Sequence, residues 1–193
     1  RQHSPVRALV RSRANAQALG ALPGVELVEG DMLRPETLAE ALSGVDRALL
    51  LSSPNQQMVE TQSAFIDAAK NAGVRKIVKF SGLNASVASP FLFNQMHAEI
   101  EGRLERSGVT WTHLRPSQFM TEYLRERPTI VAESAFFLPL DDAKLAPVDI
   151  EDIAKAAFAL LHTSGHQGKR YEMTGPEALS MTEIAQQLSL ALG

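Results

Sequence analysis

Pro5-Val6-Arg7-Ala8-Leu9-Val10-Arg11-Ser12-Arg13 is the stretch of this chain that decides its fold. The apolar residues form a short run interrupted only by Arg7, which is compatible with a buried strand. The run ends in Arg11 and Arg13, one on each side of Ser12. We predict a strand over Val6–Val10 whose exit loop presents guanidinium groups.

Short apolar runs and helical stretches alternate along most of the remaining chain. Further strands are predicted at Val25–Val28, Asp46–Leu51, Lys76–Phe80, Val109–Leu114 and Arg170–Thr174, with two short ones at Ala135–Leu140 and Ala146–Val148. Helices are predicted at Ala14–Leu22, Pro35–Leu42, Gln56–Ala72, Phe91–Arg106, Asp149–Leu161 and Thr182–Leu192. Strands separated by helices of this length imply parallel βαβ crossovers. The predicted fold class is therefore α/β, a doubly wound parallel sheet with ligand sites outside the carboxyl ends of its strands.

The 193 residues suffice for one sizeable domain, which we expect to span 1–193. Its sheet core would cover 1–116, and 117–193 would hold a loop and the final strands and helices of a small, partial substrate-capping region. No Gly-rich loop precedes the first strand. We expect the sheet to be truncated there, since the strands at Val6–Val10 and Ala48–Leu51 would both flank an absent strand and lie about 10 Å apart.

Two bare strand edges would be unstable, and three arrangements would remove them. The sequence could be part of a longer polypeptide, the two flanking strands could pair directly, or another chain could supply the strand. We favour the first arrangement, and a homo-oligomer is also compatible with the sequence.

Composition limits the classes of partner. A net charge of −3 gives no electrostatic reason to expect nucleic acid or an anionic membrane. There is no cysteine, which excludes disulfides and thiolate chemistry, and His3, His162 and His166 have no metal-ligand spacing with acidic partners. No apolar run approaches membrane-spanning length, so we expect a cytoplasmic protein.

An ordered set of short motifs covers nearly the whole chain. It comprises Val6–Arg11, Gly30-Asp31, Leu38–Asp46, Ala72–Val78, Ser81-Gly82, His97 with Glu101, Ser107–Thr112, Leu114–Pro116, Phe119-Met120, Pro147–Asp149 and Asp152–Ala154. In this order the set resembles the NmrA-like branch of the atypical short-chain dehydrogenase/reductase superfamily. The resemblance implies a Rossmann-like fold and a nicotinamide cofactor. Members of this branch include quinone and triphenylmethane-dye reductases, and also NADP-sensing regulators that catalyse nothing.

Arg11, Ser12 and Arg13 lie where such a fold selects its cofactor. An acidic residue there holds the ribose 2′-hydroxyl of NAD, whereas an arginine accommodates the 2′-phosphate of NADP. No carboxylate follows until Glu26, which favours NADP. The alternative is a solvated arginine at a strand end.

The resemblance implies further cofactor contacts at the ends of other strands. These are Asp31 and Met32 beside the adenine, Ser52, Ser53, Pro54, Ser81 and Gly82 around the nicotinamide ribose, and Pro116 and Phe119 against the nicotinamide. Two of them have alternative roles. Asp31 could form an Asx turn before Pro35, and Ser53 could cap the helix that begins near Gln56.

His97 is the candidate catalytic residue and a candidate cofactor contact. The Tyr-x-x-x-Lys pair of the superfamily would correspond to Phe93 and His97, and Phe93 has no proton to give. A histidine could donate to a developing oxyanion or bind a ribose hydroxyl. The alternative is a helix-surface pair with Glu101 at i,i+4.

The resemblance thus implies an oxidoreductase that transfers hydride from NADPH to a small quinone-like, dye-like or carbonyl acceptor. The rival interpretation, favoured by Phe93, is a non-catalytic NADP-binding redox sensor or regulator, and a third is an inactive fragment of such a protein. Without the Gly-rich loop, we expect the chain alone to bind NADP weakly or not at all.

Overall fold

The computed structural model describes residues 5–135, 137 and 143–192. Its strands are β1 Val6–Val10, β2 Val25–Glu29, β3 Arg47–Leu50, β4 Lys76–Phe80, β5 Thr110–Pro116 and β6 Lys169–Met173. Its α-helices are α1 Gln17–Gly20, α2 Leu38–Leu42, α3 Met58–Asn71, α4 Leu92–Arg106, α5 Arg127–Glu133, α6 Ile150–His162 and α7 Met181–Leu192. Short 3₁₀ helices are η1 Ala14–Ala16, η2 Pro35–Thr37 and η3 Met120–Glu126.

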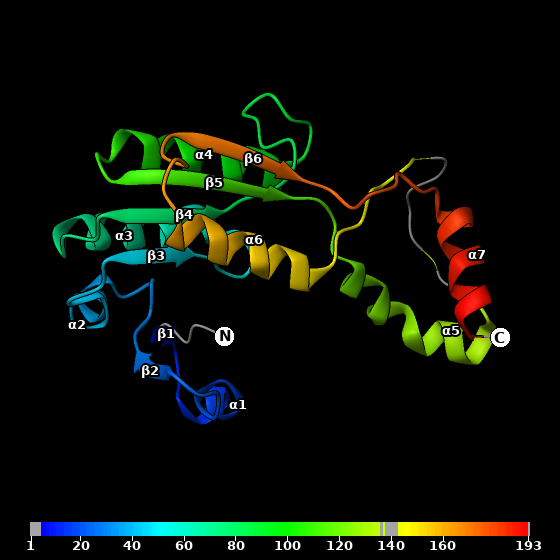
Figure 1. Cartoon of the computed structure of the whole chain (residues 1–193), viewed down its shortest axis with the longest axis horizontal. Coiled ribbons are helices and arrows are strands. Elements are labelled where there is room, and N and C mark those ends of the chain that lie inside the picture. Colours follow the sequence, from blue (N-terminus) through cyan, green and yellow to red (C-terminus); the bar gives the residue numbers. More distant parts are fainter. Residues whose placement is uncertain (1–4, 136, 138–142, 193) are drawn as a thin grey trace.

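The described strands form two separate parallel sheets. One has four strands in the order β3-β4-β5-β6, and the other pairs β1 with β2. All of the pairings are parallel, which confirms the predicted α/β class. Strands β1 and β3 do not pair, so direct closure of the two flanking strands is not the arrangement that this structure adopts. Figure 1 shows the β1–β2 ribbon lying apart from the larger sheet.

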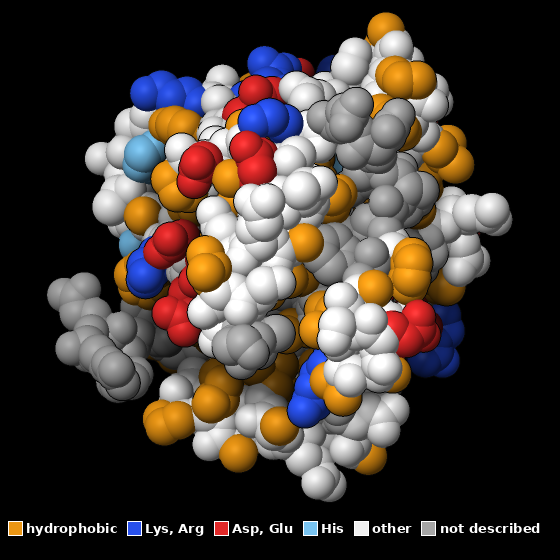
Figure 2. All heavy atoms as spheres, turned by 90° about the vertical axis from the view of Figure 1, so that its right-hand side faces the viewer, with side chains coloured by type: hydrophobic (Ala, Val, Ile, Leu, Met, Phe, Trp, Pro, Cys, Tyr) orange, Lys and Arg blue, Asp and Glu red, His pale blue; other side chains and the backbone are white. Residues whose placement is uncertain are grey.

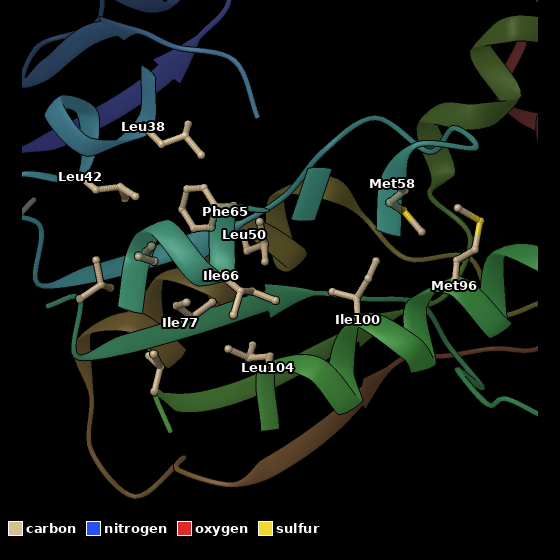
Figure 3. Packing of buried hydrophobic residues seen from close by; sticks show 14 residues of the cluster. Leu38, Leu42, Leu50, Met58, Phe65, Ile66, Ile77, Met96, Ile100 and Leu104 are labelled. Carbon is tan, nitrogen blue, oxygen red and sulfur yellow. The ribbon is translucent and has the colours of Figure 1, made fainter. Parts of the chain in front are cut away.

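Helices α3 and α4 cover one face of the four-stranded sheet, and α6 covers the other (Figure 1). Both faces of the sheet are therefore buried, as in other parallel sheets. The first core cluster joins the sheet to α2, α3 and α4 (Figure 3) and includes Leu38, Leu50, Phe65, Ile66, Ile77, Ile100 and Leu104. The second joins the sheet to α6 and comprises Val78, Leu114, Val148, Ile153, Ala157 and Leu160.

The sequence pattern explains how α4 and α6 dock on the sheet. Met96, Ile100 and Leu104 recur at four-residue spacing, which places them on one face of α4, and all three are buried. Helix α6 begins at Asp149, whose Oδ1 accepts a hydrogen bond of 2.8 Å from the backbone N–H of Glu151. This N-cap satisfies one of the free N–H groups of the first turn.

The β1–β2 ribbon is attached through α2 rather than through strand pairing. Arg7 Nη1 donates to the backbone carbonyls of Ser43 (2.7 Å) and Ala41 (3.1 Å), and Arg7 Nε donates to Glu26 (3.0 Å). Leu9 packs against the first core cluster. The ribbon therefore shares the core of the larger sheet without sharing its backbone ladder.

Several predicted elements differ from those observed. The helix predicted at Ala14–Leu22 is a 3₁₀ turn followed by the four-residue α1. The strand predicted at Ala146–Val148 is wrong: Val148 forms only an isolated bridge with Phe119, because Pro147 has no N–H to extend a ladder. The strand predicted at 135–140 lies largely outside the described residues.

The segment after β5 is more helical than predicted, since η3 and α5 were not expected. Figure 1 shows α5 and α7 beyond the end of the four-stranded sheet, and Figure 2 views the molecule from that end. Orange hydrophobic side chains are visible on this surface. The exposed apolar side chains of η3, α5 and α7 include Leu124, Val131 and Leu190. Within the described ranges, no helix is long and apolar enough to cross a bilayer.

Candidate active site

Most of the predicted site residues lie at or just after the carboxyl ends of strands, and His97 lies on α4. Ser52 follows β3, Ser81 and Gly82 follow β4, and Phe119 lies three residues after β5. Since β3, β4 and β5 are parallel neighbours, these positions share one edge of the sheet. Arg11 and Asp31 occupy the equivalent places after β1 and β2.

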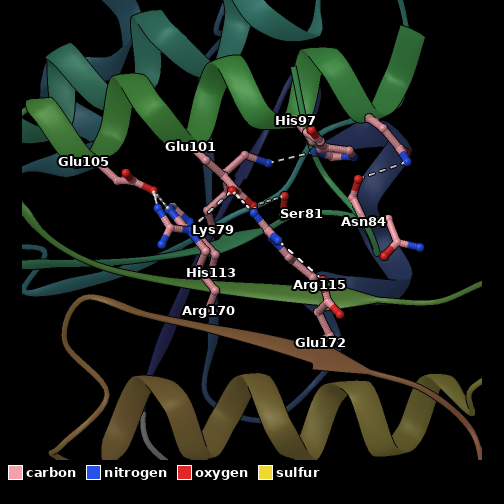
Figure 4. Close-up of polar contacts among 12 residues, drawn as sticks. Lys79, Ser81, Asn84, His97, Glu101, Glu105, His113, Arg115, Arg170 and Glu172 are labelled. Carbon is pink, nitrogen blue, oxygen red and sulfur yellow. Dashed lines mark hydrogen bonds and ion pairs between the residues drawn. The ribbon is translucent and has the colours of Figure 1, made fainter. Parts of the chain in front are cut away.

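A buried polar cluster lies under this edge, between the sheet and α4. Figure 4 shows side chains from four elements converging there. The buried and half-buried members are Lys79 on β4, Ser81 directly after β4, His97, Glu101 and Glu105 on α4, and His113 and Arg115 on β5. The exposed Arg170 and Glu172 on β6 border them. A polar layer inside an otherwise apolar core is unusual, because each buried charge needs a partner.

Lys79 is fully buried, with a relative exposure of 0%, as is His113. Its ammonium donates to the backbone carbonyl of Phe80 (3.0 Å) and contacts His97 Nδ1 (2.9 Å). Burial disfavours the charged form and lowers the pKa of Lys79 to about 7, although Glu101 opposes this shift. Lys79 therefore exchanges a proton near neutral pH.

His97 is half-buried on α4 and packs against the loop after β4. A Cβ added to Gly82 would lie 3.0 Å from His97 Cδ2 and 3.4 Å from Nε2, so the Nε2 side of the ring faces this loop. Burial, assisted by the Lys79 charge, lowers the pKa of His97 to about 4. The ring is therefore neutral at physiological pH.

The pairing of His97 with Glu101 that we considered from their spacing does not form. Glu101 instead accepts hydrogen bonds from Arg115 Nε (2.9 Å), Arg115 Nη2 (2.6 Å) and Ser81 Oγ (2.6 Å). Burial alone would raise the pKa of Glu101, but the hydrogen bonds from Arg115 and Ser81 outweigh it and lower that pKa. Glu101 is thus a buried carboxylate that forms a bidentate ion pair with the guanidinium group of Arg115.

Glu101, Glu105 and His113 bring potential ligand atoms within 4.8 Å of one another. Both carboxylates already have guanidinium partners, since Arg115 binds Glu101 and Arg170 Nη2 lies 2.5 Å from Glu105. His113 Nε2 contacts Glu105 Oε1 (3.0 Å), and its ring stacks on Trp111. The three residues form part of an ion-pair network that a metal ion would have to displace.

Arg11, Ser12 and Arg13 form the exit loop of β1, as predicted. Arg11 and Arg13 are exposed, and neither side chain is ion-paired with another described residue. The backbone N–H of Arg13 donates to Glu29 Oε1 (2.8 Å). The structure therefore brings a carboxylate beside this loop, which the spacing of residues along the sequence did not indicate.

The Asx turn considered for Asp31 is present. Asp31 Oδ1 accepts from the backbone N–H of Leu33 (3.0 Å), and its own N–H donates to Thr37 Oγ1 (2.9 Å). Met32 is half-buried and packs against the first core cluster. Contact of either residue with adenine stays a prediction.

The serines have different environments. Ser52 Oγ accepts from Gln62 Nε2 (2.9 Å), while Ser53 and Pro54 are exposed. Ser53 does not cap α3, because Asn55 Oδ1 accepts the N–H of Gln57 instead. Ser81 is buried, and its hydroxyl hydrogen is engaged by Glu101. A contact of Ser81 with a ribose could therefore use only its acceptor lone pairs.

Pro116 and Phe119 lie at the end of β5 and in the loop that follows. Pro116 is buried, and the half-buried Phe119 ring meets Phe80 edge to face at a centroid distance of 5.9 Å. This aromatic pair stands beside Ser81 and Gly82 on the carboxyl edge.

Lys79 and Arg115 were missed as site residues. A usable signal was present, because Lys79 interrupts an apolar strand predicted at the centre of a parallel sheet, where a lysine is almost never found without a function or a partner. The position of Arg115 beside Glu101 depends on packing between α4 and β5. It could not be read from their separation in the sequence.

Comparison with known proteins supplies the family. The NmrA-like family profile matches residues 1–193. An NAD(P)H azoreductase of Xenophilus azovorans is 37% identical over 189 residues, which are 98% of this chain and 66% of that protein. A quinone oxidoreductase structure from Escherichia coli, complexed with NADPH, aligns with a TM-score of 0.89 at 35% identity over 99% of this chain and 67% of that one.

A triphenylmethane reductase structure from Citrobacter sp. aligns with a TM-score of 0.88 at 25% identity, covering 100% of this chain and 68% of that one. The chain thus spans about two thirds of the length of these relatives. The match over every residue, together with the parallel sheet and its polar carboxyl edge, leads to one conclusion: this chain belongs to the NmrA-like family.

Proposed function

We propose that this chain forms the cofactor-binding and catalytic part of an NADPH-dependent reductase of quinone-like, dye-like or carbonyl acceptors. The observation that carries the proposal is His97, a neutral imidazole at the carboxyl edge of a sheet whose relatives include a quinone reductase and an azoreductase. When bound, NADPH would supply the hydride that reduces the acceptor.

The exit loop of β1 fits the 2′-phosphate of NADP. Arg11 and Arg13 present exposed guanidinium groups that no described carboxylate pairs with, and the planar guanidinium group matches a phosphate. Asp31 and Met32 follow β2 and would lie toward the adenine. Ser52, Ser53, Pro54, Gly82, Pro116 and Phe119 would hold the ribose and nicotinamide, together with His97 and the lone pairs of Ser81.

The surface next to His97 suits an apolar, planar acceptor. Phe93 lies one helical turn before His97 on α4, at i,i+4 spacing, and is 46% exposed. Val87 and Phe91, in the loop before α4, are 75% and 69% exposed. These side chains could cover one face of an aromatic ring while His97 Nε2–H donates to an oxygen of the acceptor.

The second candidate is a sensor that binds NADP without turnover. Phe93 favours it, because this side chain stands in place of the tyrosine acid and cannot transfer a proton. The sensor would bind NADPH as a reductase does, and 1,4-benzoquinone would not be reduced.

Titration of the purified chain with NADPH, followed by cofactor fluorescence, tests the proposal. We expect NADPH to bind at least about tenfold tighter than NADH, with the preference lost in Arg11→Ala, because removal of one charged phosphate contact costs about 1.5–3 kcal/mol. Arg106→Ala is the matched control, since this exposed arginine ends α4 at the opposite edge of the sheet. Equal binding of the two cofactors, or an Arg11→Ala variant that keeps the preference, would contradict the assignment.

A further inference from the structure

The contact between Lys79 and His97 has a chemical consequence for the protonation of the imidazole. A charged lysine amine has three N–H donors and no acceptor. Because Lys79 Nζ lies 2.9 Å from His97 Nδ1, this nitrogen must accept the hydrogen bond while Lys79 is charged. A neutral imidazole then carries its only proton on Nε2, the nitrogen that faces the loop after β4.

We propose that Lys79 is the positioning residue for His97: it holds the ring as a neutral Nε2–H donor and returns a proton to Nδ1 when the Nε2 proton leaves. The inference rests on the proposed function for the identity of the final proton acceptor. Its physical basis is the geometry of the two side chains, which requires no cofactor to be bound.

The proton balance of the step explains why His97 needs Lys79. An imidazole that gave up its only N–H would become an anion. This cost is avoided if the Nε2–H bond breaks as an O–H bond forms on the acceptor, while Nδ1 takes a proton from the Lys79 ammonium. The ring stays neutral, Lys79 becomes a neutral amine, and one solvent proton then restores the starting state.

The surroundings of Lys79 suit this exchange. The amine has no solvent contact of its own, so His97 is the titratable neighbour through which a proton can reach the edge of the sheet. The charged and titratable groups that face Lys79 are Glu101 on α4 and His113 and Arg115 on β5. The charges of Glu101 and Arg115 largely cancel, because the two side chains are ion-paired. Burial lowers the pKa of His113. The neighbours of Lys79 on α4 and β5 therefore do not fix its amine in the charged or in the neutral form.

Lowered pKa values agree with the geometry. His97, with a pKa of about 4, does not hold a second proton at neutral pH and cannot act as an imidazolium acid. Lys79, with a pKa of about 7, is charged in about half of the molecules at that pH. The pair can therefore donate below about pH 7 and loses this ability as Lys79 deprotonates.

Nitrogen-15 NMR of the histidine rings tests the inference on the chain without cofactor. In the wild type we expect His97, assigned by loss of its signals in His97→Gln, to be protonated on Nε2 alone at about pH 5.5 to 6.5, where Lys79 is charged. Its Nδ1 shift should move with a midpoint near pH 7 as Lys79 titrates. In Lys79→Met this midpoint should disappear and the Nδ1–H form should appear, whereas Lys70→Met, which removes an exposed lysine of α3, should match the wild type.

A wild-type ring that is protonated on Nδ1 at about pH 6, or doubly protonated at neutral pH, would overturn the inference. So would a Nδ1 shift that is constant through pH 7. These readings use the wild type, so they stand even where a variant fails to fold.

Turnover provides a separate reading with NADPH and 1,4-benzoquinone. We expect kcat of the wild type to fall about tenfold for each pH unit above about 7, and the profile of Lys79→Met to be low and flat. A wild-type profile that stays level from about pH 6 to 9 would overturn the relay. Absence of any turnover, with the NMR result as expected, would contradict the proposed reductase and leave the positioning of His97 by Lys79 supported.

Discussion

Replacement of Lys79 by methionine should make the chain more stable, and the gain should shrink as the pH rises. Methionine has nearly the same length and no charge, so Lys79→Met removes the burial of an ammonium group that is 0% exposed. The variant also leaves the carbonyl of Phe80 without this hydrogen bond, a loss of about 1–3 kcal/mol that does not depend on pH.

The magnitude follows from the pKa of Lys79, which burial lowers from 10.5 to about 7. One pKa unit corresponds to about 1.4 kcal/mol, so the charged form is disfavoured in the folded state by about 5 kcal/mol. Between about pH 7 and pH 10.5 the unfolded chain binds more protons than the folded chain. Wild-type stability therefore rises with pH in that window, by about 3 kcal/mol from pH 7 to pH 9.5 through Lys79 alone.

Urea unfolding followed by the fluorescence of Trp111, the single tryptophan, measures this effect. The difference in unfolding free energy between Lys79→Met and wild type should fall by about 3 kcal/mol from pH 7 to pH 9.5. Lys70→Met should run parallel to the wild type, because Lys70 is exposed. Parallel curves for Lys79→Met and wild type would refute the reasoning, since Lys79 would then titrate as an exposed lysine.

Two other substitutions test the packing around His97. Glu101→Gln removes the carboxylate that Arg115 binds at 2.6 Å, and should lower the unfolding free energy by about 2–3 kcal/mol, because the guanidinium keeps only the more exposed Glu172 at 3.4 Å as its counter-charge. A loss below about 1 kcal/mol in urea unfolding would show that water replaces the carboxylate. Gly82→Ala should displace the His97 ring, since the added Cβ would lie 3.0 Å from Cδ2. We expect the NMR signals of the His97 ring to shift in Gly82→Ala while those of the other histidines stay unchanged. Unshifted His97 signals would contradict the contact between Gly82 and the His97 ring.

Local pattern predicts most of the regular elements of this protein. The predicted strands at Val6–Val10 and Lys76–Phe80 match β1 and β4 residue for residue. The predicted helix at Phe91–Arg106 differs from α4 by one residue. These segments have an apolar periodicity and clear end signals, which act over a few residues. The predicted and observed elements agree less well after β5, where the chain forms isolated bridges and a 3₁₀ helix instead of regular strands.

The candidate site, like the fold, has features that the sequence predicts and features that depend on tertiary packing. The sequence alone determined which loops meet at the carboxyl edge, because parallel βαβ order places every strand exit on the same side. It also predicted a site role for His97, through a resemblance of ordered motifs, and that role stays a prediction.

Only the tertiary structure decided the partners of these residues. It separates β1 from β3, pairs His97 with Lys79 rather than with Glu101, and turns the Ser81 hydroxyl inward. The physical reason is that burial and charge pairing depend on which side chains from β4, α4 and β5 face each other across the core. That arrangement is set by packing and not by spacing along the chain.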